Sequence, residues 1–366
     1  MTRRRTQDAG TQDVAPHEAP RGGAWTRRET LAGLGLLGVA LPLSCRHPAE
    51  AMRTHDMERK DVKDVVVVGG GPGGLSAALM LGRARRKVLL CDAGPRRNAA
   101  ATEVHYFLTR DGIPPQEFRD IAREQLKPYD VEVRDVRVRN IERVGAAFRV
   151  ELEDGGVVEA RRVLLATGMV DVPRDLPGYR ELWGNAIFQC PYCHGWEVQA
   201  RPWGVLATSE MYLDFALVLR SWTEDLVVFT QGAFPVPEAR RAQLARVGVR
   251  IEERRIRGLV TGAGAHGAAL AAVELEDGTR VPREVLFDHP PQRQVPLVQK
   301  LGLELTEEGF VKAQPTGETS VPGIFAVGDM SQRMQAAIAA ASAAAIAASM
   351  LNHSLSLELA GPVSEG

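Results

Sequence analysis

Two cysteines separated by two residues, Cys190 and Cys193, are the side chains of this sequence best placed to do chemistry. Such a pair closes a small disulfide at little backbone cost, and Pro191 between them stiffens the loop. The same spacing also occurs as half of a zinc site, but tetrahedral zinc needs two further ligands, usually from a second pair. The sequence has no second pair, since its other cysteines are Cys45 and Cys91. We therefore predict a redox-active dithiol and no metal, with zinc and an inert structural disulfide as alternatives.

A glycine-rich turn between a predicted strand and a predicted helix indicates nucleotide binding. Residues 65–68 form an apolar run typical of a buried strand, and residues 75–83 have the character of a helix. The turn contains G-x-G-x-x-G, formed by Gly69, Gly71 and Gly74. The first glycine permits the tight turn, the second lets the backbone approach a pyrophosphate, and the third lets the helix pack on the strand. The pyrophosphate would lie at the helix N-terminus, whose dipole favours an anion.

Further predicted strands extend this unit. Residues 87–91 form a strand that ends in Asp92, at the position where an acid accepts the ribose hydroxyls. Residues 131–150 alternate apolar and charged side chains, as strands with one solvated face do. Residues 157–165 form another strand, which ends at Ala-Thr-Gly.

A second strand that ends in an acid lies near the C-terminus. Residues 319–329 read Thr-Ser-Val-Pro-Gly-Ile-Phe-Ala-Val-Gly-Asp, so this strand ends at Gly328 and Asp329. An alanine-rich helix follows from about Gln335 to Met350. Its composition is typical of a buried helix of high intrinsic propensity.

These pieces together resemble the low-molecular-weight thioredoxin reductase family of flavoproteins. The shared motifs are the N-terminal glycine motif, the Ala-Thr-Gly, the inserted Cys-x-x-Cys and the C-terminal strand, in this order from about Asp64 to Leu351. The resemblance implies that the bound nucleotide is FAD. By this resemblance the ADP half is bound by Gly69, Gly71, Gly74 and Asp92. The ribitol region is contacted by Gly328 and Asp329, and the flavin pyrimidine by Gln335 and Ala336.

The resemblance also implies an α/β fold of two Rossmann-like, three-layer domains of the FAD/NAD(P)-binding type, the second inserted in the first. We expect a leader at residues 1–57, the two parts of the FAD-binding domain at 58–176 and 287–352, an inserted NADPH-like domain with the dithiol at 177–286, and a tail at 353–366. A homodimer is implied by the resemblance alone.

His194 departs from the family pattern, in which an Asp that acts as acid and base follows the second cysteine. The sequence Cys-Pro-Tyr-Cys-His-Gly, with Asp-His-Pro-Pro-Gln at residues 288–292, looks closer to the branch of dithiol oxidases that close disulfides in natural products such as gliotoxin and holomycin. A histidine with an ordinary pKa of about 6.5 can take a thiol proton near neutral pH. We predict that Cys190, Cys193 and His194 are catalytic; a loop histidine without a role is the alternative, and His289 is more simply a turn residue.

The inserted domain departs from the family in a second way, because the glycines of its nucleotide turn are missing. Ala207, Ser209 and Tyr212 stand where small residues are expected, and Glu210 adds a negative charge. The next arginine pair, which begins at Arg240, does not directly follow the second strand. The strand–helix–strand pattern itself remains, at residues 205–206, 211–219 and 226–229. Our hypothesis is that this domain has kept its shape and lost NADPH.

The sequence therefore predicts an FAD-dependent thiol-disulfide oxidoreductase. In the expected cycle a substrate dithiol attacks the disulfide at Cys190, His194 manages the protons, Cys193 faces the flavin, and two electrons pass through FAD to O2 or another acceptor. The resemblance alone assigns the outer and inner cysteine. The alternatives are an NADPH-dependent thioredoxin-disulfide reductase and a non-catalytic flavoprotein that binds a partner.

The expected partner is a small dithiol or disulfide, or a thioredoxin-like protein. Residues 105–111, an aromatic and charged loop, are a candidate border of the flavin, with a plain surface loop as the alternative. The composition, with 45% apolar residues, 25% charged residues and a net charge of -1, gives no electrostatic reason to expect nucleic-acid binding.

The N-terminal leader resembles an export signal. An arginine pair at residues 27–28 precedes the apolar run 31–43, which as a helix spans roughly 20 Å, short of the roughly 30 Å needed to cross a membrane. With the small-residue end at 49–51, the pattern predicts a cleavable twin-arginine signal peptide and a periplasmic or cell-envelope location. The alternatives are a lipoprotein anchor at Cys45 and a cytoplasmic protein that starts at Met57.

Overall fold

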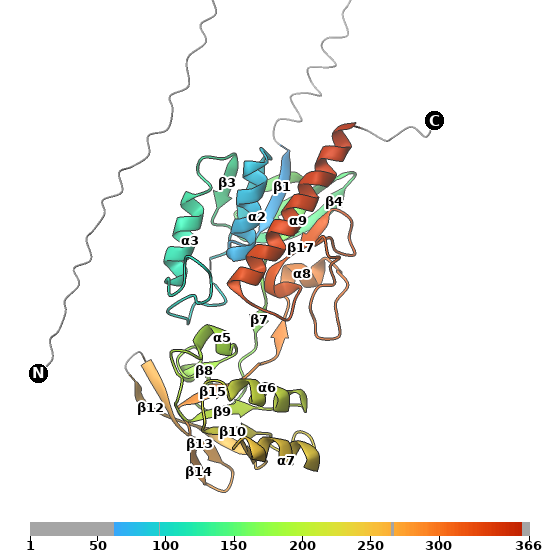
Figure 1. The fold of residues 1–366 in the computed structure, drawn as a ribbon. Helices are drawn as coiled ribbons and strands as arrows, with labels where there is room; N and C mark the ends of the chain where they lie inside the picture. The colour runs from blue at the N-terminus through green and yellow to red at the C-terminus, as the bar shows by residue number, and fades with distance from the viewer. Residues whose placement is uncertain (1–61, 95, 265–266, 361–366) are drawn as a thin grey trace, which may run out of the picture. The chain divides into compact units, whose positions relative to one another are not determined.

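A computed structural model describes residues 62–94, 96–264 and 267–360 of the chain (Figure 1). The predictions for the leader, including the signal peptide, the Cys45 anchor and the start at Met57, lie outside these described residues. The described part is a mixed α/β structure with two sheets of mainly parallel strands, as the sequence predicts.

The first sheet carries the glycine-rich turn. Its strand order is β3-β2-β1-β6-β5-β4, and β17 pairs with the last residues of β6, Val163–Leu165. Strands β1, β2, β3, β6 and β17 run parallel, whereas β4 and β5 form an antiparallel meander beside β6. The bounds are β1 (Lys63–Val68), β2 (Val88–Cys91), β3 (Val131–Arg134), β4 (Val138–Val144), β5 (Ala147–Leu152), β6 (Val157–Leu165) and β17 (Ile324–Ala326).

Strand β1 is buried on both faces because each face of the sheet has its own apolar layer. Side chains alternate along a strand. Val65 and Val67 therefore pack on the side of α2 (Pro72–Arg83) and α9 (Ala337–Leu357), which lie against each other (Figure 1). Val66 and Val68 pack on the opposite side, with side chains of the β4–β5 meander. Two further helices in this half are α3 (Pro115–Glu124) and α8 (Pro296–Lys300).

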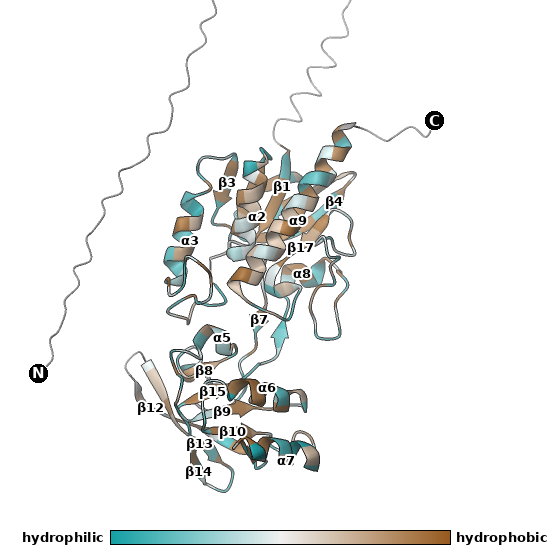
Figure 2. Cartoon of the chain, in the orientation of Figure 1, coloured by the Kyte–Doolittle hydropathy of each residue, from teal (hydrophilic) through white to brown (hydrophobic). Residues whose placement is uncertain are grey.

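The second sheet is parallel, with strand order β11-β10-β9-β15-β8. Its strands are β8 (Ile187–Phe188), β9 (Trp203–Leu206), β10 (Leu226–Phe229), β11 (Arg250–Glu252) and β15 (Val285–Phe287). Apolar side chains of α6 (Met211–Leu219) and α7 (Glu238–Arg246) pack on one face, and α6 is correspondingly brown in Figure 2. On the other face lies an antiparallel sheet of β12 (Ile256–Gly264), β13 (Gly267–Leu275) and β14 (Arg280–Pro282).

The chain passes between the two sheets twice, through two short strands that pair with each other. β7 (Val170–Asp171) leads to the second sheet and β16 (Gln292–Arg293) leads back, and the two are antiparallel. The remaining short elements are α4 (Tyr179–Leu182), α5 (Pro191–His194), η1 (Gly328–Met330) and η2 (Glu358–Ala360). The exact domain boundaries stay predictions.

Several predicted elements have the expected bounds, namely the strands at 157–165 and 226–229 and the helix at 211–219. The C-terminal helix differs from its prediction, because α9 begins at Ala337 and continues to Leu357, into the predicted tail. Its second half continues the burial pattern, with Leu351 and Leu355 in the core. By length and composition α9 would also pass as a membrane span, but a core helix meets the same criteria.

Candidate functional site

The two cysteines lie on a single helical turn between the second sheet and the first half of the chain. Cys190 directly precedes α5, and the backbone N–H of Cys193 donates to the Cys190 carbonyl at 3.2 Å. Both are free thiols and partly buried. Both sulfurs thus lie on one turn.

The two thiols have opposite pKa shifts. A hydrogen bond from the Cys193 thiol lowers the pKa of Cys190 to about 7, with help from the backbone N–H groups of Cys193 and Tyr192 and from the Tyr106 hydroxyl, while burial opposes the shift. The hydrogen bond to Cys190 and burial raise the pKa of Cys193 well above its ordinary value. Near neutral pH the pair therefore shares one negative charge, held mainly on Cys190.

A small cavity opens beside the dithiol. Its volume is about 250 Å³, slightly below the roughly 300–1,000 Å³ of sites that take drug-sized ligands. Its lining consists of His105, Tyr106, Asp111, Tyr192, Trp196 and Glu197. The His105 ring lies 3.1 Å from a Glu103 oxygen and 3.5 Å from oxygens of Asp111 and Glu197, so carboxylates surround it. A ligand of this cavity would be small and would meet aromatic rings, a histidine and carboxylates.

His194 lies deeper than the sequence suggests. Its ring stacks on Phe188 with centroids 4.5 Å apart. Burial, with a smaller contribution from His105, lowers the pKa of His194 to about 4 against an opposing backbone hydrogen bond to Cys190. The expectation that His194 titrates near neutral pH is therefore wrong, because burial disfavours the charged form of its ring. Its Nδ1 is buried and has no hydrogen-bond partner among the described residues.

The glycine-rich turn has the close contacts that its sequence predicts. Gly69 has a φ of +115°, and a Cβ there would lie 2.3 Å from the Ala166 oxygen. A Cβ on Gly74 would lie 1.8 Å from the Gly69 oxygen, so only glycine lets α2 approach β1. By contrast, a Cβ on Gly71 would meet no described atom within 4 Å. The turn is thus closed toward the protein and open at Gly71, where a pyrophosphate would approach, and these residues fit a dinucleotide.

Asp92 lies after β2 as predicted, but arginines occupy its carboxylate. Arg119 pairs with Oδ2, and the Arg123 guanidinium lies 3.3 Å from the same oxygen. The Gly94 backbone N–H donates to Oδ1 at 3.3 Å. Ribose hydroxyls would therefore share the Asp92 carboxylate with Arg119. The contact between Asp92 and the nucleotide stays a prediction.

Arg97 binds side chains from three other segments of the chain. It donates to Asp171 on β7 through two nitrogens, both at 2.8 Å, to Asp329 at 2.8 Å and to Gln189 at 2.7 Å. Gln189 directly precedes Cys190, so this network connects the dithiol turn to the predicted flavin contact Asp329. Its hydrogen bonds and ion pairs with Asp171 and Asp329 raise the pKa of Arg97 despite burial, so the guanidinium stays charged.

The predicted flavin end of α9 has unused hydrogen-bonding capacity. Gln335 exchanges side-chain hydrogen bonds with Gln292 on β16 at 2.8 and 2.9 Å. Ala336 is buried at the N-cap of α9, where no described side chain caps the helix, and Gly328 opens η1 with a φ of +76°. The buried Gln332 Nε2 has no partner among the described residues. Unpaired buried donors are rare in native proteins, so a bound group with acceptor atoms fits this place.

Side chains of the protein itself lie at the turn of the second sheet where the sequence pattern expects a nucleotide. The Tyr212 ring packs against His289, with centroids 5.7 Å apart, and against Phe215 at 6.5 Å. The surface residue His289 thus contacts the rings of Tyr212 and Phe215, and partial desolvation by these neighbours lowers its pKa. The arginines after β10 are also engaged: Arg240 pairs with Asp214, and Arg241 lies 2.8 Å from a Glu253 oxygen.

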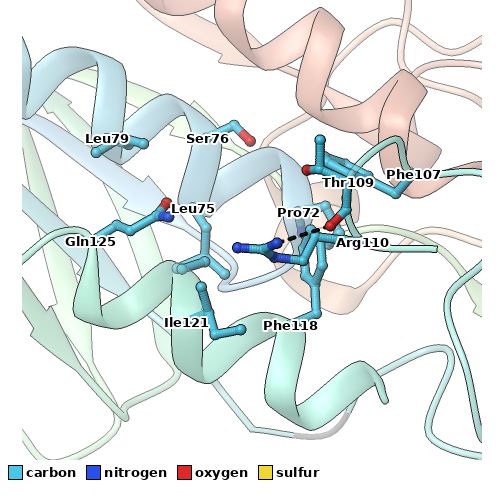
Figure 3. Close-up of a pocket in the computed structure, with 11 residues that line it drawn as sticks. Pro72, Leu75, Ser76, Leu79, Phe107, Thr109, Arg110, Phe118, Ile121 and Gln125 are labelled. Atoms are coloured by element: carbon cyan, nitrogen blue, oxygen red, sulfur yellow. Dashed lines mark hydrogen bonds between the residues drawn. The ribbon is translucent and has the colours of Figure 1, made fainter. Parts of the chain in front are cut away.

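A second cavity, of about 290 Å³, lies along the nucleotide-binding helix (Figure 3). Leu75, Ser76 and Leu79 of α2 form one side of it, and residues of α3 and of the loop 107–110 complete it. Phe107 of this loop stacks edge-on against Phe118 of α3, with centroids 5.0 Å apart. This contact anchors the loop that carries Tyr106 to the first half of the chain.

Sequence reasoning found the dithiol, the glycine turn and the acid-ended strands, but it missed two contacts. Arg97 was not singled out, since nothing in its local sequence pairs it with Asp171 or Asp329. Tyr106 lay within the loop 105–111 that the sequence marked as a possible border of the site. Its position against the sulfurs required the three-dimensional structure.

The sequence of this chain is similar to those of known proteins. Residues 63–344 match the family model described as pyridine nucleotide-disulphide oxidoreductase. A probable thioredoxin reductase from Arthroderma benhamiae is 33% identical over 296 residues, covering 73% of each chain. The thioredoxin reductase tcpT of Claviceps purpurea is 33% identical over 285 residues, covering 75% of this chain and 88% of that protein.

A solved structure shows the same likeness. The crystal structure of HlmI is 37% identical, superposes with a TM-score of 0.75, and covers 82% of this chain and 94% of that one.

Proposed function

The chain belongs to the pyridine nucleotide-disulphide oxidoreductase family, within its thioredoxin reductase-like flavoproteins, and from this membership we propose that it is an FAD-dependent dithiol oxidase. The family makes it an oxidoreductase that acts on sulfur groups. The proposal adds a direction, from substrate dithiol to substrate disulfide, and a small-molecule substrate.

The residues that would hold FAD are those of the predicted contacts. The Gly69–Gly74 turn would take the ADP half, and Asp329 with Gln335 and Ala336 would lie at the flavin end. When bound, FAD would supply the two-electron chemistry that returns the reduced dithiol to the disulfide, with O2 or another acceptor as final oxidant. The unpaired Gln332 Nε2 and the open side of Gly71 support this assignment.

The observation that supports the proposal is that one helical turn holds both thiols, whose pKa values shift in opposite directions. A substrate thiolate attacks Cys190 Sγ, the Cys190–Cys193 bond breaks, and Cys193 leaves with the electron pair. The second substrate thiolate then attacks the substrate sulfur of the mixed disulfide and expels Cys190. A thiolate of low pKa leaves faster, and the pKa of Cys190 is lowered to about 7. The two substrate protons go to solvent, the Cys190–Cys193 disulfide takes up two electrons and becomes the dithiol, and the substrate dithiol becomes a disulfide.

The second nucleotide turn supports oxidation rather than NADPH-driven reduction. Tyr212 fills the place of a small residue and packs on His289. Arg240 and Arg241, which could neutralise a 2'-phosphate, are paired with carboxylates. NADPH-dependent thioredoxin reduction is the second candidate, because the relatives from Arthroderma benhamiae and Claviceps purpurea are named thioredoxin reductases.

Anaerobic titration of the flavin absorbance separates these functions. Dithiothreitol should bleach the flavin, whereas NADPH and NADH at micromolar concentration should not. Prompt bleaching by NADPH would overturn the proposal in favour of a reductase. Failure of every dithiol to bleach the flavin would indicate a non-catalytic flavoprotein.

We also propose that the protein is exported by its twin-arginine leader. The supporting observation is the arginine pair ahead of a short apolar run. Mass spectrometry of the mature N-terminus tests it: cleavage after the small residues at 49–51 is expected, and a chain that begins at Met57 in the cytoplasm contradicts export.

A further inference from the structure

Tyr106 has a backbone conformation that a tyrosine rarely adopts. Its φ is +47°, in the left-handed region, where residues with a Cβ are strained. The Asp111 carboxylate accepts its backbone N–H at 2.6 Å, and the Val104–Ile113 bridge closes the loop. Strain of this kind persists where the surrounding structure imposes it, and such residues cluster at functional sites.

The strained backbone directs the side chain to the dithiol. The Tyr106 hydroxyl oxygen lies 3.8 Å from Cys193 Sγ, and it also contributes to the lowered pKa of Cys190. Phe107, the next residue, packs on Phe118 of α3, so the loop is held against α3, while the sulfurs belong to the turn that follows β8 of the second sheet. Tyr106 is therefore a side chain outside the Cys-x-x-Cys turn that contacts a reacting atom.

We propose that Tyr106 is a catalytic residue that donates a hydrogen bond to Cys193 as that sulfur becomes a thiolate. The inference rests on the proposed dithiol oxidation. When the substrate thiolate forms its bond to Cys190 and the disulfide breaks, negative charge appears on Cys193, the sulfur with the poorer leaving ability in this pair. The Cys193 sulfur and the phenol oxygen lie within hydrogen-bond distance of each other, and once Cys193 has become a thiolate the phenol O–H is the donor.

The surroundings keep the phenol protonated for this role. Burial, followed by the charges of the two sulfurs, raises the pKa of Tyr106 above its ordinary value. The other titratable groups facing this place are His105, Asp111 and Glu197 at the cavity, and His194 and Asp329 on the dithiol side. The nearby carboxylates oppose a negative charge on Cys193, so a neutral donor at the sulfur offsets them.

Tyr106→Phe tests the hydroxyl and keeps the ring. In a Cys190→Ser background, Cys193 is the single redox thiol, and its alkylation by iodoacetamide can be followed peptide by peptide across pH. Cys91 is buried, and burial raises its pKa to about 12, so it should not interfere. Loss of a charge-assisted hydrogen bond should raise the Cys193 titration midpoint and slow alkylation at a fixed alkaline pH about threefold or more.

Tyr129→Phe in the same background is the matched control, because the Tyr129 hydroxyl pairs with Arg83 instead. It should leave the Cys193 profile unchanged. If Tyr106→Phe fails to fold, as judged by circular dichroism, Tyr106→Asn replaces it, since asparagine accepts left-handed backbone. Profiles that superimpose with and without the Tyr106 hydroxyl would overturn the inference.

The assay distinguishes this inference from the proposed function. Alkylation of Cys193 needs no substrate, so a raised midpoint would establish the hydrogen bond even if no dithiol were oxidised. With both cysteines present, steady-state turnover of dithiothreitol should then show a lower kcat with unchanged KM for Tyr106→Phe. A changed KM with an unchanged rate would make Tyr106 a binding residue and would contradict the catalytic role.

Discussion

At the residue scale, the site works through unequal sulfurs. The hydrogen bond between them, rather than the helix turn alone, is the largest contribution to the lowered pKa of Cys190. It is likewise the largest contribution to the raised pKa of Cys193. Because one thiol stabilises the anion of the other, removing Cys193 should change the reactivity of Cys190 before any substrate is considered.

We expect Cys193→Ala to raise the pKa of Cys190 from about 7 toward its ordinary 9.0. The thiolate is the reactive form, so alkylation at pH 7 should slow, by up to about fiftyfold for a full return to the ordinary value. Iodoacetamide rates measured from pH 5 to 10 check this, with the wild-type rate half-maximal near pH 7. The control is Cys190→Ser, which should retain FAD yet lose dithiol oxidation. An unchanged Cys190 profile in Cys193→Ala would refute the coupling.

At the element scale, the β1–α2 turn contains glycines that are required for two different reasons, close packing of the chain and open space for a ligand. At Gly74 the space belongs to the Gly69 carbonyl, which a Cβ would approach to 1.8 Å. At Gly71 the adjacent space contains no described atom within 4 Å. Gly74 is thus needed for the close packing of α2, and we predict that Gly71 is needed for a ligand.

Gly74→Ala should lose both stability and flavin, because α2 must move away from β1; overpacking of this kind costs about 1–3 kcal/mol. Gly71→Ala should melt at the wild-type temperature but bind less FAD, because its methyl group enters the space of the pyrophosphate. Thermal melts of the flavin-free proteins and flavin content after purification measure the two effects. Wild-type flavin content in Gly71→Ala would contradict the assigned FAD site.

At the scale of the whole molecule, one face of α9 remains apolar and exposed. Ile338, Ile346, Met350 and Leu357 are all exposed, and their spacing puts them on one side of the helix. The opposite side of α9 packs in the core through Ala344 and Leu351. An exposed apolar stripe of this kind fits a second copy of the chain, in line with the homodimer that the family resemblance implies.

We therefore expect Ile346→Glu to convert a dimer to a monomer, because the charge would be buried unpaired between two copies. Light scattering coupled to size-exclusion chromatography measures the mass directly. Val144→Glu, at an equally exposed apolar position on β4, is the matched control and should stay dimeric. A monomeric wild-type protein at micromolar concentration would refute the dimer.

The sequence by itself determined the parts of this protein that depend on local patterns. Apolar runs predicted β1, β6 and β10, and the G-x-G-x-x-G spacing identified Gly69 and Gly74, because strand burial and positive φ leave a signature within a few residues. The Cys-x-x-Cys spacing identified the dithiol, because this pattern also lies within a few residues.

Only the tertiary structure decided the environment of that dithiol. Tyr106 contacts Cys193 across 87 positions of sequence, and Arg97 reaches Asp329 across 232. The pKa of His194 departs from the sequence expectation because burial, which residue type does not reveal, removes water from the ring. Contacts between distant segments and the exclusion of solvent are properties of the packed chain, and they adjust the thiol pKa values that the local Cys190–Cys193 hydrogen bond shifts most.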